Sequence, residues 1–144
     1  MNSTINKLNE TINAVRQLKN QQVDWAHKAS PLKWSKKEII GHLIDSAQIN
    51  LQRFVRCTYE EGFRLTYEQV EWVQAARYQH ADIDDLIDLW ALLNLQIARV
   101  LENYPADRLT AKCDNSKQEP NLQTVEWLAG DYVEHMLHHL KDIL

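Results

Sequence analysis

Glycine and proline are both scarce in this sequence, with three of each among 144 residues. So few turn-forming residues disfavour a fold of many strands and favour long helices. The length suits one domain of ordinary size, and a hydrophobic content of 44% can supply its core. This balance excludes a disordered or fibrous chain. We therefore expect a single domain over residues 1–144.

Basic charge and long apolar runs are lacking as well. Lys and Arg number 16 against 20 Asp and Glu, so no basic surplus exists to neutralise phosphates, and we expect no nucleic acid partner. No segment reaches the roughly 18 apolar residues of a transmembrane helix, and the first residues lack the apolar stretch of a signal peptide. Cys57 and Cys113 stand alone, as reduced thiols do. These absences predict a cytoplasmic protein that does not bind a membrane.

Apolar residues recur at steps of three and four in four segments, which is the spacing of an amphipathic helix. Ser35 and Glu38 form the S-x-x-E pattern of a capping box at the start of the second segment. The expected buried faces include Val55 and Leu89, and Trp127 is assigned to the core. The four helices are expected at about residues 4–20, 36–58, 82 or 84 to just before 105, and after 121 or 124 to 143.

The two long connections differ in character. Residues 59–81 are rich in aromatics and contain a short helical pattern at 67–76, and they are long enough to cross the length of a bundle. Residues 105–123 are polar and aperiodic, which predicts a loop. Gly41, in the first turns of the second helix, costs about 1 kcal/mol relative to Ala. We interpret it as a place where another backbone or a ligand comes close.

Three of the six histidines form an H-x-x-H-H pattern on the fourth helix. His135 and His139 lie one turn apart on nearly the same face, so both imidazoles can bind one metal ion. His138 points away from both and is expected to flank the site. His42 on the second helix is the candidate third ligand. The alternative for His42 is a solvated surface histidine.

The depths of these histidines along their helices bear on the topology. His42 lies about 10 Å from the start of its helix, and the other pair lies about 7–14 Å from the end of theirs. These depths match only if the two helices are antiparallel, which the crossover at 59–81 permits through up-down-down-up order. We therefore predict an all-α four-helix bundle of that order. Arg53 shares the His42 side of the helix but lies about 16 Å further along, so we expect it to be solvated or ion-paired.

The two histidine blocks together resemble a known family. The stretch WSKKEIIGHLIDS at residues 34–46 resembles the helix-two signature of the DinB/YfiT-like metalloprotein superfamily, and WLAGDYVEHMLHHLKDI at 127–143 resembles its helix-four signature. Trp72 and Tyr78 in the crossover are also similar to that family. The resemblance extends from about residue 25 to the end of the chain.

This resemblance implies an up-down-down-up bundle, often dimeric, with a divalent metal ion such as zinc or nickel. Carried onto this sequence, the implied metal ligands are His42, His135 and His139, with water completing the shell. His138 matches the family's additional histidine, which does not usually bind the metal. A homodimer acting on a small-molecule substrate is the corresponding expectation.

Three neutral imidazoles leave at least one coordination position open, as in catalytic rather than structural sites. Members similar to this family are S-transferases that use bacillithiol, mycothiol or glutathione, and we expect this activity first, because such a metal takes sulfur readily. The alternative is a metal-dependent hydrolase in which hydroxide at the metal attacks a carbonyl. A third hypothesis is a non-enzymatic metal-binding or dimerisation module.

Three carboxylates lie one turn from the predicted ligands. Asp45 is the candidate catalytic acid or base, since it follows His42 by three residues. Asp131 and Glu38 each precede a histidine by four residues and could orient its imidazole. The alternative for all three is an ordinary carboxylate on a helix surface, with Glu38 serving the capping box.

Overall fold

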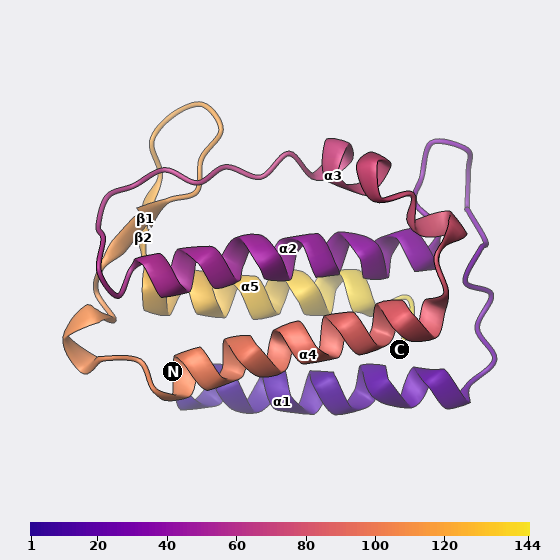
Figure 1. The fold of residues 1–144 in the computed structure, drawn as a ribbon, viewed down its shortest axis with the longest axis horizontal. Helices are drawn as coiled ribbons and strands as arrows, with labels where there is room; N and C mark the ends of the chain where they lie inside the picture. Colours follow the sequence, from indigo (N-terminus) through magenta and orange to yellow (C-terminus); the bar gives the residue numbers. More distant parts are fainter.

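Four long helices form the bundle: α1 (Asn2–Gln17), α2 (Lys36–Arg56), α4 (Ile83–Glu102) and α5 (Val125–Leu140). The computed structural model describes all of residues 1–144. α1 and α5 run in one direction and α2 and α4 in the other, so the order is up-down-down-up (Figure 1). The predicted all-α bundle and its topology are confirmed.

The crossover between α2 and α4 runs back along the outside of the bundle (Figure 1). It carries the short helix α3 (Gln69–Ala76) and the 3-10 turn η2 (Tyr78–His80), so the predicted helical pattern in this segment is confirmed. Because the crossover returns the chain to the end where α2 began, α4 can run parallel to α2. The antiparallel α5 then brings its carboxyl end beside the amino end of α2 (Figure 1).

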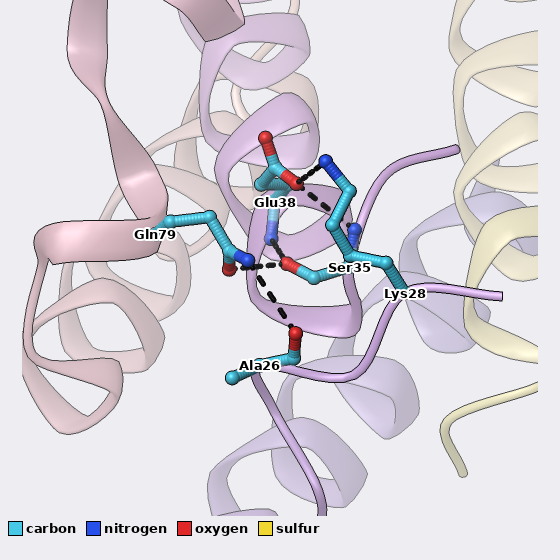
Figure 2. A network of polar contacts seen from close by, with 5 residues as sticks. All are labelled: Ala26, Lys28, Ser35, Glu38 and Gln79. Atoms are coloured by element: carbon cyan, nitrogen blue, oxygen red, sulfur yellow. Dashed lines mark hydrogen bonds and ion pairs between the residues drawn. The ribbon is translucent and has the colours of Figure 1, made fainter. Parts of the chain in front are cut away.

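The capping box at the start of α2 is present and is tied to two other segments (Figure 2). Ser35 Oγ accepts a hydrogen bond from the Glu38 amide and donates one to Gln79 Oε1 at 2.6 Å. Gln79 in turn donates to the Ala26 carbonyl oxygen, and Lys28 pairs with Glu38 at 3.5 Å. The cap therefore fixes the first turns of α2, where His42 lies, relative to both the crossover and the preceding loop.

Gly41 receives an aromatic side chain rather than a backbone or a ligand. A Cβ atom at this position would lie 2.0 Å from the Tyr78 ring, so any larger residue would collide with it. The Tyr78 hydroxyl continues past Gly41 and donates a hydrogen bond to Asp45 Oδ1 at 2.5 Å. A close approach at Gly41 was therefore correctly expected, but the approaching group is the Tyr78 side chain. This contact anchors the end of the crossover on α2.

The segment expected to be a loop contains a small antiparallel hairpin, β1 (Lys112–Asp114) and β2 (Leu122–Thr124), so that expectation was incomplete. Asp114 closes the hairpin loop by accepting hydrogen bonds from the Ser116 and Asn121 amides. Strands of three residues are too short to show an alternating hydrophobic pattern, so these two could not be predicted from the sequence. The hairpin also pairs with the start of the crossover through backbone hydrogen bonds.

The core comprises 30 buried residues drawn from all four long helices and their connections. Val55, Leu89 and Trp127 were wrongly assigned to it: Leu89 and Trp127 each keep 45% of their surface exposed, and Val55 keeps 39%. Val55 and Leu89 lie at the edges of their helical stripes, and Trp127 lies outside the stripe of its helix. Cys57 and Cys113 are buried free thiols. None of the helices combines the length and apolar character needed to cross a membrane.

Candidate metal centre

The three predicted histidines converge at the end of the bundle where α2 begins and α5 ends. The ring centroid of His42 lies 5.7 Å from that of His135 and 4.8 Å from that of His139, and the last two lie 4.6 Å apart. One nitrogen from each ring falls within 4.8 Å of the other two. The antiparallel arrangement of α2 and α5 therefore brings the three rings together, as predicted from the positions of the histidines along their helices.

His42 is completely buried, so its alternative assignment as a solvated surface residue was wrong. Its ring packs between Trp34, at a centroid distance of 4.9 Å, and Tyr67, which stacks on it at 5.8 Å. His42 Nδ1 lies 3.0 Å from the Tyr67 hydroxyl oxygen, and that hydroxyl donates to the His42 carbonyl oxygen at 3.3 Å. With its proton used in this way, the hydroxyl can only accept from Nδ1–H.

This hydrogen bond leaves the second nitrogen of the ring with a lone pair and no partner. His42 Nε2 is buried and makes no hydrogen bond within the chain. A buried polar atom without a partner is costly unless something absent from the protein chain satisfies it. The rings of His135 and His139 bring two further imidazoles to the same place, and three imidazoles are a donor set that suits zinc, nickel or a similar divalent ion. The residues present therefore fit such a metal.

The electrostatics keep the three rings in the neutral form that metal binding requires. Burial, reinforced by the neighbouring imidazoles, lowers the pKa of His42 to about 3. Burial likewise lowers the pKa of His135, although the Asp131 carboxylate opposes this, and it lowers the pKa of His139. His138 is exposed and lies outside the cluster, with its ring 5.9 Å from that of His139, as predicted for a flanking residue.

Two cavities reach the three histidines, each through different members of the cluster. The first, of about 220 Å³, lies between α2 and α5 and is reached by His42 and His135. Its other walls are mainly polar, because α2 contributes Ser46, Asn50 and Arg53 at one-turn intervals along the same face. The second, of about 670 Å³, is reached by His139 and is more apolar, with Pro31, Leu32, Trp34, Ile39, Val70 and Val73 among its lining residues.

Arg53 lies in the first cavity and is neither solvated nor ion-paired, so that expectation was wrong. Only 7% of its surface is exposed to solvent, and no carboxylate lies within ion-pair distance of it. Its guanidinium donates to the Leu65 carbonyl oxygen at 2.6 Å and to Asn50 Oδ1 at 3.3 Å. The crossover thus covers this arginine, which the helix spacing alone did not reveal.

The three candidate carboxylates have different positions. Asp45 is buried behind Tyr78 and lines a separate groove between α2 and α3, and burial raises its pKa to about 6. Glu38 is engaged in the capping box. Asp131 lines the first cavity beside His135. No hydrogen bond joins any of these carboxylates to an imidazole of the cluster. At His42 the Tyr67 hydroxyl, rather than Glu38, bonds the ring nitrogen Nδ1.

Tyr67, Ser46 and Asn50 are the residues of this site that the sequence interpretation did not single out. Ser46 and Asn50 could have been found, since they continue the helical face that begins at His42 and ends at Arg53. Tyr67 could not, because it lies in the crossover and no periodic pattern relates it to His42. Its position depends on how the crossover packs against α2.

An up-down-down-up helical bundle with three histidines gathered at one end defines the class of protein. The sequence matches the model of the DinB superfamily over residues 6–143, so this chain belongs to that superfamily. No curated protein matches it.

Two solved structures from Bacillus subtilis share the fold. One is YfiT, described as a probable metal-dependent hydrolase with an unusual four-helix bundle topology, which matches with a TM-score of 0.87 and 21% identity over 99% of this chain and 82% of YfiT. The other is the DinB-like protein YjoA, with a TM-score of 0.64 and 13% identity over 97% of this chain and 86% of YjoA. At these identities the similarity shows a common fold.

Proposed function

We propose that this chain is a metal-dependent hydrolase whose divalent ion is held by His42, His135 and His139. The observation that carries the proposal is the buried and unpartnered Nε2 atom of His42, on a ring whose centroid lies 5.7 Å from that of His135 and 4.8 Å from that of His139. The description of YfiT as a probable metal-dependent hydrolase supports the same activity. A divalent ion in this position would supply Lewis acidity, lowering the pKa of water and polarising a substrate carbonyl.

The chain's own residues have distinct tasks in this proposal. Tyr67 holds His42 in the tautomer that presents Nε2, and Trp34 keeps water from the other side of the ring. His135 is exposed to the first cavity, so a small-molecule substrate can reach the histidines from there. Among the candidate carboxylates, Asp131 lines this cavity, which favours it over Asp45 for exchanging protons with a bound substrate.

A thiol-dependent S-transferase is the second candidate, and the pair of cavities favours it. A transferase must place two substrates at one centre, and here a polar cavity and a more apolar cavity both reach the histidine cluster. In that activity the thiol would enter one cavity and the electrophile the other. A hydrolase needs only one of the two for its substrate.

One assay separates these activities. The untagged protein loaded with Zn²⁺ or Ni²⁺ would be incubated with a panel of esters, amides and alkylating electrophiles, each with and without glutathione, bacillithiol or mycothiol. Turnover without thiol that is lost in His139→Ala and kept in His138→Ala supports the hydrolase. Turnover only with thiol supports the transferase. Metal binding without turnover of any compound would contradict both and favour a binding module.

A further inference from the structure

The strongest feature that the metal site does not explain is the buried guanidinium of Arg53 at the far end of the first cavity. A guanidinium has five N–H donors, and the chain uses two of them, which leaves three. The Nε–H in particular is buried without any partner. A buried cation with unused donors and no carboxylate partner is expensive to maintain, which indicates that a ligand completes its hydrogen bonding.

The surroundings of Arg53 favour an anion as that ligand. Asn50 accepts from Arg53 and points its own amide donors at Ser46, so its orientation is fixed by the chain. Lys117 adds a second cation to the lining of the cavity. Its exposed ion pair with Glu68 is of a kind that contributes little and is easily exchanged.

One carboxylate opposes this positive charge. Asp131 lines the same cavity, yet it does not come within ion-pair distance of Arg53. The two cations, Arg53 and Lys117, therefore outnumber the single carboxylate among the lining residues. The planar fork of an arginine matches the paired oxygens of a carboxylate or a phosphate.

We propose that Arg53, supported by Asn50 and Lys117, binds an anionic group of the substrate at the end of the cavity remote from the three histidines. Some 16 Å of α2 separates the Cα atoms of His42 and Arg53, at about 1.5 Å per residue. The substrate is therefore an elongated molecule whose reacting bond lies at the histidines and whose carboxylate or phosphate lies at Arg53. The assignment of this anion to a substrate rests on the proposed function. The anion site itself does not depend on that function.

The test is direct observation of the Arg53 side chain by NMR. The full chain, labelled with ¹⁵N-arginine and dialysed free of metal and chelator, would be titrated with glutarate or with inorganic phosphate. Sodium chloride at matched ionic strength is the control. The Arg53 Nε–H resonance, assigned by its loss in Arg53→Lys, is expected to shift with a saturable dependence on the probe. A response to glutarate alone or to phosphate alone identifies the anion.

Two variants control for structural effects, because Arg53→Lys also removes the contact with the crossover at Leu65. Asn50→Asp keeps the acceptor for Arg53 but places a negative charge beside it, and is expected to weaken binding of the probe by about tenfold or more. Asn103→Asp adds the same charge at an exposed position outside the cavity and should leave binding unchanged.

Equal binding by Asn50→Asp and wild type, or the absence of a shift at Arg53 with both probes, would overturn the anion site. Hydrolysis by the metal-loaded protein in that case would leave the proposed function standing alone. Conversely, anion binding at Arg53 without any turnover would defeat the proposed function and leave the anion site intact.

Discussion

α2 and α4 are neighbouring helices of nearly equal length that differ in what they bury. α4 buries one polar residue, Asn94, and both ends of its amide are satisfied, by the Trp90 carbonyl oxygen and the Tyr132 hydroxyl. α2 buries five polar or charged residues: His42, Asp45, Ser46, Asn50 and Arg53.

The unsatisfied atoms sharpen this contrast. α4 leaves one buried side-chain atom without a partner, the indole Nε1 of Trp90, whereas α2 leaves an atom on each of three ionisable groups, His42, Asp45 and Arg53. Such groups lower stability unless a ligand or a proton satisfies them. We conclude that α4 is a scaffold helix, and that α2 carries the chemistry at some cost in stability.

The largest effect on stability is expected from truncation in α4. Ile97 is completely buried, so Ile97→Ala should lower the free energy of unfolding by about 2–4 kcal/mol through lost burial and the cavity left behind. Metal affinity per folded chain should not change. Urea denaturation combined with a metal titration measures both quantities. A large loss of metal affinity would contradict the assignment of α4 as a scaffold helix that is separate from the chemistry of α2.

Gly41→Ala should be the most damaging small substitution in α2, because the new methyl group would occupy the position of the Tyr78 ring. Overpacking of this kind costs about 1–3 kcal/mol, against a gain of about 1 kcal/mol in helix propensity. In a Tyr78→Ala background the collision is absent, and Gly41→Ala should become neutral or stabilising. A double-mutant cycle of unfolding free energies tests this, and additive effects would show that Tyr78 is not the obstacle.

Asp45 should make the unfolding free energy depend on pH, whereas the one buried polar residue of α4, Asn94, does not ionise. Burial raises the pKa of its folded form to about 6 from an ordinary value of 3.8, so its contribution to stability is full below about pH 4 and is lost as pH rises through 6. Asn at this position cannot ionise. The unfolding free energy of Asp45→Asn relative to wild type should therefore rise by roughly 1–3 kcal/mol between pH 4 and pH 7. A difference independent of pH would contradict the raised pKa.

Tyr67→Phe should have the smallest effect on stability and a clear effect on the site. It removes the hydroxyl that accepts from His42 Nδ1, at a cost of about 1 kcal/mol in unfolding free energy. Metal affinity should fall by about tenfold or more, since partners of this type fix the tautomer and orientation of a ligand. Competition with a chromogenic chelator measures that affinity, with Tyr59→Phe on the exposed surface as the matched control.

Much of this site could be predicted from the sequence because the relevant residues lie on helices. Helical spacing placed His135 and His139 on one face, and the depth of His42 along α2 then required the observed topology. The same regularity made the edges of the apolar stripes unreliable, since Val55 and Leu89 fit the period but stay exposed.

The remaining features depend on the crossover and the hairpin, which have no periodic signal. The covering of Arg53 by the Leu65 backbone and the hydrogen bond from His42 to Tyr67 join segments that are distant in sequence. Such contacts follow from tertiary packing rather than from local pattern. Asp45 as a catalytic acid or base stays a prediction, and its position behind Tyr78 identifies the barrier that a proton would have to pass.

The most direct test of the central claim is the metal content of untagged protein purified without chelator, measured by elemental analysis. We predict one divalent ion per chain in wild type and in His138→Ala, and none in His139→Ala, although the two substitutions remove adjacent histidines. Equal metal content in both variants, or no metal in folded wild-type protein, would contradict the account.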